Sequence, residues 1–279
     1  MSGPAIRTMT RADLDLALTW AEAEGWNPGR ADAAAFRGAD PDGFLMAHVD
    51  GDPVASLSIV RFGDATAFLG LYICRPAYRG RGIGHALWRA GMDRLAPRTT
   101  GLDGVVDQQA NYARSGFVRS HPNLRVSGPL VPEGPDRTMP LTPATLGAAL
   151  ALDRAVTGFD RSAFMRDWLC GDPDRVARIL VRDGRVAALG VRRPCVSGAK
   201  IGPLLAEGRA DAAAMLDGLA HGAGTDRFSI DVPAANPAAM AVVEARGLSP
   251  EFETARMWRG PAPLQDLGRT YGIGTLELG

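Results

Sequence analysis

Runs of apolar residues and apolar positions at helical spacing along residues 5–126 predict a sheet with helices packed on it. Thr10, with Asp13 three residues later, is close to a capping box at a helix start, and Asp50-Gly51-Asp52-Pro53 is typical of a hairpin turn. The first helix runs from Thr10 to a loop at 24–29. The other expected elements are strands at 5–8, 44–49, 54–62, 65–73, 100–106 and 117–126 and helices at 83–95 and 108–115.

A second set of elements begins after residues 129–136, a stretch rich in proline that indicates a linker. A chain of 279 residues suits two domains of about 140 residues each. We therefore expect domains at 1–128 and 137–279 with the linker at 129–136. Beyond the linker the expected helices are 142–155, 160–169, 210–220 and 237–246, and the expected strands are 137–141, 176–182, 186–192, 199–205, 228–232 and a last one through Met257.

The composition favours a globular protein and argues against several function classes. Hydrophobic residues make up 46% of the chain, and 31 basic side chains balance 31 acidic ones. A net charge of zero argues against a nucleic-acid binder or a basic membrane-surface protein. No apolar run approaches the ~18 residues of a membrane span, and residues 1–7 lack the pattern of a secretion signal. Three cysteines, odd in number and far apart, indicate neither a metal site nor a disulfide framework, so a cytoplasmic protein is expected.

The segment Arg79-Gly80-Arg81-Gly82-Ile83-Gly84 lies between an expected strand, which Pro76 ends, and an expected helix. Three glycines at alternate positions cost conformational entropy, so a helix entrance this flexible needs a reason. Bare backbone lets several N–H groups converge on phosphate oxygens, and the helix N-terminus and two arginines add positive charge. The pattern favours an anion site, and a tight turn without a ligand is the alternative. Neither a nucleotide triphosphate loop nor a dinucleotide-binding glycine pattern is present.

The same segment closely resembles the acetyl-CoA pyrophosphate signature of the GNAT superfamily of N-acetyltransferases. That signature is Arg/Gln-x-x-Gly-x-Gly/Ala, which Arg79, Gly82 and Gly84 match. Downstream, Tyr112-Ala-Arg-Ser-Gly116-Phe117 resembles the superfamily's Tyr-x-x-x-Gly-Phe, in which a helix carries a tyrosine and the chain turns into the next strand. The resemblance covers the first half of the chain. It implies an α/β fold with a mixed sheet whose neighbouring strands splay apart to admit the pantetheine arm.

The resemblance assigns acetyl-CoA to the end of the expected strand and to the loop after it. Main-chain groups of Ile73 and Arg75 would hold the thioester and stabilise the developing oxyanion, while the loop would hold the pyrophosphate. Tyr112 would protonate the departing thiolate, because a phenol with a pKa of ~10 suits that task. A core tyrosine that closes the sheet against its helix is the alternative. The residues assigned to the coenzyme are Leu71, Ile73, Cys74, Arg75, Arg79, Gly80, Arg81, Gly82, Ile83 and Gly84.

The second half of the chain repeats part of this pattern without its chemistry. Gly247-Leu248 stands where Gly116-Phe117 stands in the first half, and Val243 takes the place of the tyrosine. Residues 201–210 lack the arginine and paired glycines of the signature, and Glu207 would repel phosphate. This resembles the two-lobed GNAT proteins with one active and one degenerate lobe. Convergence on one fold without duplication is the alternative.

The acceptor side and the general base are less well defined. Trp26 and Asn27 lie in a loop rich in turn formers and are candidates for the substrate wall, although a Trp26 tucked over the core edge fits equally well. Strand 65–73 has no acidic residue, whereas many GNAT enzymes carry a glutamate there. The base therefore stays unassigned. Catalysis without a base, on an amine that arrives partly neutral, is an alternative. Carboxylates that could act through water are Asp64, Asp103 and Asp107, although a turn or surface position is the favoured interpretation of each.

The sequence thus predicts an acetyl-CoA-dependent N-acetyltransferase that acts on a primary amine of a small molecule. Its first lobe would be catalytic, and its second lobe would shape or cover the acceptor site. A sensor that binds acetyl-CoA without turnover is the main alternative, and a structural pairing module is the third. The closing segment 271–279 is either a strand that shields one lobe or a flexible end. The acceptor and the oligomeric state do not follow from the sequence.

Overall fold

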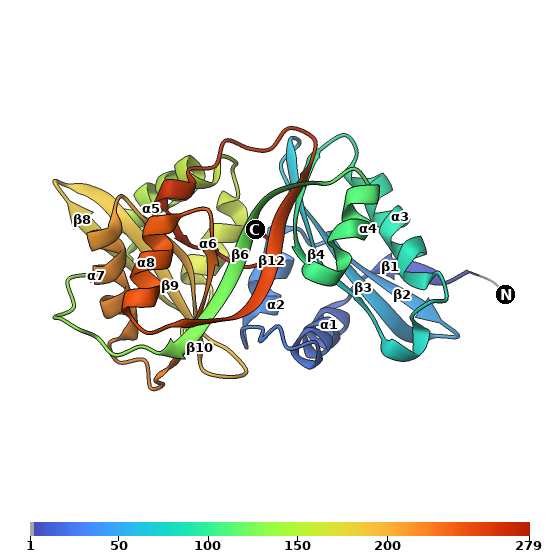
Figure 1. The fold of residues 1–279 in the computed structure, drawn as a ribbon. Coiled ribbons are helices and arrows are strands. Elements are labelled where there is room, and N and C mark those ends of the chain that lie inside the picture. Colours follow the sequence, from blue (N-terminus) through green and yellow to red (C-terminus); the bar gives the residue numbers. More distant parts are fainter. Residues whose placement is uncertain (1–2) are drawn as a thin grey trace.

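Strands from both halves of the chain form one continuous sheet in the computed structural model, which describes residues 3–279 (Figure 1). The sheet order is β1-β2-β3-β4-β5-β12-β6-β11-β10-β9-β8-β7, and β13 pairs with β10. The strands are β1 (Ala5–Thr8), β2 (Phe44–Val49), β3 (Asp52–Phe62), β4 (Thr66–Cys74), β5 (Thr99–Val105), β6 (Val118–Pro129), β7 (Met139–Pro140), β8 (Val176–Arg182), β9 (Arg185–Pro194), β10 (Ala199–Ala206), β11 (Arg227–Pro233), β12 (Ser249–Arg259) and β13 (Thr270–Gly272).

Helices cover both faces of this sheet and bury two core clusters on one face and one on the other. On one face, α3 packs on the strands of the first half, and α7 and α8 pack on those of the second. On the other face, a single core joins α1 and α2 to α5 and α6, with Phe36 stacked on Trp168 at 6.2 Å between ring centroids. The helices are α1 (Arg11–Ala23), α2 (Asp32–Ala39), α3 (Ile83–Leu95), α4 (Gln109–Arg114), α5 (Pro143–Thr157), α6 (Ser162–Cys170), α7 (Arg209–Ala220) and α8 (Pro237–Ala245), with short 3-10 turns η1 (Pro76–Tyr78), η2 (Val106–Gln108) and η3 (Leu267–Arg269).

The last long strand of each half crosses to the other half. β6 pairs with β11, so that Arg125 lies opposite Asp231, and β12 pairs with β5, so that Arg256 lies opposite Asp103. β6 and β12 also pair with each other at the centre of the molecule, where Figure 1 shows them side by side. Two segments that are separate in sequence are therefore interleaved in space.

The expected fold class, a mixed α/β sheet, is confirmed, and the predicted strands match the observed ones to within a few residues. The capping box at Thr10 and Asp13 is also observed. One helix was not predicted, namely α2. It is eight residues long, begins at Asp32 after the N-cap Ala31, which provides no side-chain cap, and buries Phe36 against α6. Tertiary packing supplies most of the stability of such a short helix, so the local sequence alone does not predict it.

Candidate functional site

A cleft opens where two parallel strands of the first half separate. β4 and β5 pair only from Thr66↔Thr99 to Leu69↔Leu102, although both strands continue beyond that point. The space between their ends is a cleft of about 560 Å³. Residues that line it include Trp26, Tyr72, Ile73, Cys74, Arg79, Gly80, Gly82, Ile83, Gly84, His85 and Gln108.

A β-bulge in β4 lies at the inner end of this cleft. The register between β3 and β4 shifts between Ser56↔Ile73 and Ser58↔Gly70, and Leu71 has a positive φ of 46°. The Ser56 hydroxyl donates a hydrogen bond to the Leu71 carbonyl at 2.7 Å and so stabilises the bulge. A bulge turns backbone groups away from the ladder. It therefore exposes main-chain groups of β4 at the point where the strands part.

The glycine-rich loop forms the outer end of the cleft. Gly80 and Gly82 have φ values of 74° and 77°, which glycine adopts without strain, and no atom lies within 4 Å of where a side chain would stand on either. Gly82 is the N-cap of α3, so the first N–H groups of a 13-residue helix begin at the cleft without intrahelical partners. This arrangement is suited to an anion.

Arg79 lies between this loop and α1. Its Nε donates to the Cys74 carbonyl at 2.8 Å, and its guanidinium forms an ion pair with Glu24. Arg81, in contrast, lies over the Tyr78 ring, 5.0 Å from the centroid, and is absent from the cleft lining.

Arg75, which the sequence assigned to the thioester through its main chain, is bonded to β3 through its main-chain N–H. Its N–H donates to the Val54 carbonyl at 3.0 Å, because β3 and β4 still pair at this level. Its side chain donates to the Pro53 carbonyl at 3.3 Å, outside the cleft. Arg75 therefore has no free amide with which to bind a thioester.

Tyr112 on α4 is buried beside the bulge. Its ring stacks on Trp88 at 5.3 Å between centroids, and Gly104 leaves room for it, since a Cβ at that position would lie 2.9 Å from the ring. Burial raises the pKa of Tyr112 well above its ordinary value, and it raises the pKa of the neighbouring Tyr72 to about 12. Both phenols therefore keep their protons at neutral pH. Burial also raises the pKa of Cys74, an effect that nearby Arg79 partly offsets.

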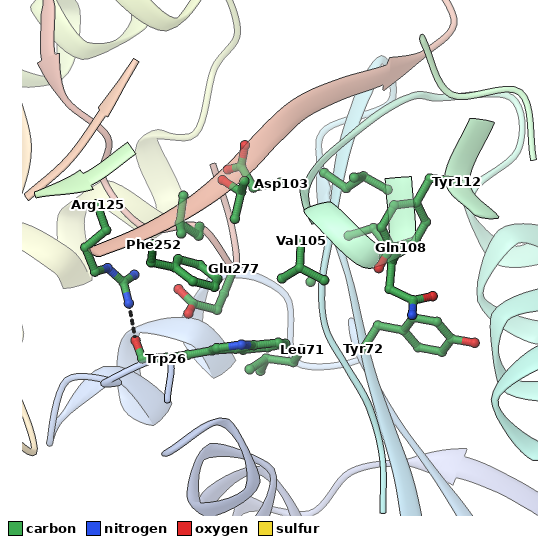
Figure 2. Close-up of a pocket in the computed structure, with 15 residues that line it drawn as sticks. Trp26, Leu71, Tyr72, Asp103, Val105, Gln108, Tyr112, Arg125, Phe252 and Glu277 are labelled. Carbon is green, nitrogen blue, oxygen red and sulfur yellow. Dashed lines mark hydrogen bonds between the residues drawn. The ribbon is translucent and has the colours of Figure 1, made fainter. Parts of the chain in front are cut away.

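A narrow cavity of about 70 Å³ continues from the cleft into the centre of the molecule (Figure 2). The two spaces share the lining residues Trp26, Tyr72, Val105 and Gln108. Leu71 and Tyr112 line the inner cavity, and the opposite wall comes from β6, β12 and the segment after β13. That wall consists of Arg125, Phe252, Thr254, Leu276 and Glu277.

Two of the three charged side chains that line the cavity, Arg125 and Asp103, are held in buried ion pairs. Arg125 binds Asp231 through two hydrogen bonds of 2.7 and 3.0 Å and also donates to the Trp26 carbonyl at 2.7 Å. Arg256 binds Asp103 through two bonds of 2.7 and 2.9 Å. Because removal of one partner would leave a buried charge uncompensated, these pairs fix the positions of β6, β11 and β12.

Of the two residues predicted for the acceptor wall, the structure places one at the cavity and the other outside it. Trp26 lines both the cleft and the inner cavity. Asn27 lines neither space. Its side-chain amide donates to the Ser197 carbonyl and accepts from the Ser197 N–H, both at 2.9 Å, and so ties α1 to the second half.

Sequence reasoning missed the residues that the second half contributes to the cavity, above all Phe252 and Glu277. No local motif marks them, because they reach the cavity only through the pairing of β12 with β5 and through the course of the chain after β13.

The second half contains an equivalent separation of two parallel strands, β10 and β11. The segment that begins with β13 fills the space between them. β10 and β11 pair only from Ala199 to Ile201, and β13 then pairs with β10 at Leu204↔Gly272 while Ile273 donates to the Asp231 carbonyl at 2.8 Å. Where the glycine-rich loop would recur, Glu207 approaches Arg269 of η3 to 3.9 Å. The segment 271–279 is thus buried along most of its length and includes a strand.

Comparisons with known proteins agree with this two-part architecture. The family model described as "Acetyltransferase (GNAT) family" matches residues 11–117, and the one described as "Acetyltransferase (GNAT) domain" matches residues 149–272. The chain is 31% identical to a holothin acyltransferase from Pseudoalteromonas sp. (strain SANK 73390), over 93% of this chain and 89% of that protein.

Solved structures resemble the fold along its whole length. A putative acetyltransferase from Pyrococcus horikoshii superposes with a TM-score of 0.82 and 22% identity, covering 100% of this chain and 97% of the other. A tandem GNAT protein from the clavulanic acid biosynthesis pathway superposes with a TM-score of 0.61 and 18% identity, covering 92% of this chain and 99% of the other.

Proposed function

Because the chain belongs to the GNAT superfamily of acyltransferases and has two GNAT domains in tandem, we propose that it transfers an acetyl group from acetyl-CoA to a primary amine of a small molecule. The first domain would hold the coenzyme. The second would close the acceptor side, and its own strand separation is filled by β13.

The observation that carries this proposal is the continuous path from the glycine-rich loop to the bulge at Leu71. The open backbone at Gly80 and Gly82 and the start of α3 fit a diphosphate, because they offer N–H groups and a positive dipole end with no side chain in the way. The separated ends of β4 and β5 fit an extended pantetheine arm. The thioester would then lie near Leu71 and Tyr112.

Leu71, Ile73 and Cys74 would contribute main-chain contacts to the arm, and Arg79 would turn from Glu24 to the diphosphate. Tyr112 would donate its proton to the departing sulfur, because burial keeps the phenol protonated. Donor groups placed before the reaction cost no reorganisation as charge develops, which is the general advantage of such a site.

The size and lining of the inner cavity favour a small acceptor molecule with an apolar body. Its walls combine the Trp26 and Phe252 rings with polar groups that include Asp103, Arg125 and Glu277, and its volume of about 70 Å³ excludes a folded protein segment. The relative named "Holothin acyltransferase" supports acyl transfer as the reaction class of the proposal.

Release of free thiol from acetyl-CoA in the presence of a panel of aromatic and aliphatic primary amines tests this function. We expect release with at least one amine, together with an amide product of matching mass, and a slower reaction with longer acyl-CoA donors. Binding of acetyl-CoA without thiol release for any amine would favour a sensor, and no binding in calorimetry would favour a structural pairing module.

A further inference from the structure

The last residues of the sequence run from the second domain into the acceptor cavity of the first. After β13 the chain leaves β10 and β11 and reaches β4, and Figure 1 shows its end beside β6 and β12 at the centre of the molecule. A Cβ on Gly70 would lie 2.3 Å from the Glu277 carbonyl oxygen, so only glycine allows this approach. Glu277 is therefore in backbone contact with the residue that precedes the bulge at Leu71.

Two carboxylates line the inner cavity, and only one of them has an oxygen available. Both oxygens of Asp103 accept hydrogen bonds, from Asn123 at 2.7 Å and from Arg256 at 2.7 and 2.9 Å. Within residues 3–279, the Glu277 carboxylate accepts from the Thr275 hydroxyl through Oε2, while its Oε1 accepts no hydrogen bond. Glu277 also has no ion-pair partner within 4.0 Å in that part of the chain, although only 6% of its surface is exposed.

Charged side chains of six strands surround this carboxylate. Arg125 on β6 and Asp231 on β11 form one pair, Arg256 on β12 and Asp103 on β5 form another, and Lys200 on β10 donates to the Trp26 carbonyl at 3.2 Å. A further cation, Arg193 on β9, is paired with Asp32. Each of these groups already has a partner, which leaves the Glu277 carboxylate free for an incoming ligand. Figure 2 shows it among the labelled residues of the cavity, near Trp26, Phe252 and Arg125.

We propose that the Glu277 carboxylate accepts a proton from the amine substrate. Glu277 belongs to segment 271–279, which fills the strand separation of the second domain and brings this carboxylate to the first domain. This rests on the proposed function. The carboxylate takes one proton from the incoming ammonium, and the lone pair of the neutral amine forms the N–C bond. The C–S bond breaks with its electron pair on sulfur, sulfur takes the Tyr112 proton, and the second proton shed by nitrogen restores the phenol. The proton on Glu277 then leaves to solvent.

Kinetics of Glu277→Gln, with the panel amine that gives the fastest thiol release, tests this assignment. We expect kcat/KM at pH 7 to fall by about 10²-fold, the usual contribution of a general base. The loss should shrink as pH rises toward the pKa of the amine, since the amine then arrives neutral. A weakly basic aromatic amine should lose less for the same reason, and Glu277→Asp should keep part of the rate.

Two controls separate this role from a structural one. Glu251→Gln changes a partly exposed glutamate on β12 and should leave kcat/KM unchanged. Calorimetric binding of acetyl-CoA should be the same for the wild type and Glu277→Gln. If Glu277→Gln keeps the wild-type rate and pH profile, the assignment fails and the proposed function stands. If none of the panel amines causes the wild-type protein to release thiol, the proposed function fails and the assignment fails with it.

Discussion

At the scale of single residues, burial decides which protonation states this site can use. The Tyr112 ring packs against Trp88 and Phe117, and desolvation of its phenol disfavours the phenolate. A group held in its protonated form can donate a proton at neutral pH but cannot serve as a base. Glu277 and Tyr112 therefore suit opposite steps of one reaction, and they enter the cavity from different halves of the chain.

Tyr112→Phe removes the proposed acid while keeping the ring contacts. We expect kcat to fall by about 10²-fold with little change in the KM for acetyl-CoA, because the phenol acts only on the departing sulfur. Steady-state thiol release checks this. Tyr271→Phe, a buried tyrosine of β13, serves as the matched control and should keep kcat. Equal rates for Tyr112→Phe and the wild type would identify Tyr112 as a core residue only.

His121 on β6 makes stability depend on pH. Burial, together with nearby Arg256, lowers the pKa of His121 to about 4 from its ordinary 6.5. The unfolded chain therefore binds a proton below pH 6.5 that the folded chain does not, so stability is lost as pH falls from 6.5 toward 4. The loss reaches roughly 3 kcal/mol at most. Urea unfolding at pH 4.5, 5.5 and 7.5 should show a weaker pH dependence for His121→Gln, and an identical dependence would contradict this account.

At the scale of elements, the loop before α3 shows what local sequence can predict. Pro76 ends a strand, the glycines give backbone freedom, and the apolar spacing from Ile83 predicts the helix, so strand, loop and helix follow from adjacent residues. The bulge at Leu71 was not predicted, because it depends on the register of β3 and on the Ser56 hydroxyl. Glu277 was not predicted either, because its position depends on the path of β13 between two distant strands.

A matched pair of glycine substitutions tests the loop. Gly82→Ala and Gly222→Ala both place a side chain at a positive φ, 77° and 62°, with open space around it. Each should lower the free energy of unfolding by about 1 kcal/mol. Only Gly82→Ala should also weaken acetyl-CoA binding, by about tenfold or more, since Gly222 lies beyond α7. Calorimetry and thermal unfolding measure both effects, and equal affinities for the two variants would exclude the loop as the diphosphate site.

At the scale of the whole molecule, exchange of β6 and β12 joins the two domains into one cooperative unit. The core that contains α1, α2, α5 and α6 also crosses the boundary. The sequence predicted two tandem domains but not this interleaving, because strand order depends on contacts between residues more than 100 positions apart, such as Arg125 and Asp231.

We therefore expect a single unfolding transition. The chain has five tryptophans. Fluorescence of Trp88 in the first half, and of Trp168 in the second, should each be followed in a variant that lacks the other four. In each variant it should report the same midpoint as far-UV circular dichroism. Arg125→Ala leaves Asp231 buried without its partner and should lower the free energy of unfolding by about 3–5 kcal/mol while keeping one transition. Arg11→Ala, which removes an exposed ion pair on α1, should change stability by less than about 1 kcal/mol. Two separate midpoints would contradict the cooperative unit.

Fusion of the two sheets also limits how copies of this protein can aggregate. Two separate sheets would present four outer strands with unsatisfied backbone groups, whereas the fused sheet formed by residues 3–279 presents two. These are β1, with four residues, and β7, with two residues of which one is proline. Short outer strands and a proline that cannot donate a hydrogen bond are poor templates for addition of a foreign strand. Two of the three longest strands, β6 and β12, are protected on both sides by their neighbours.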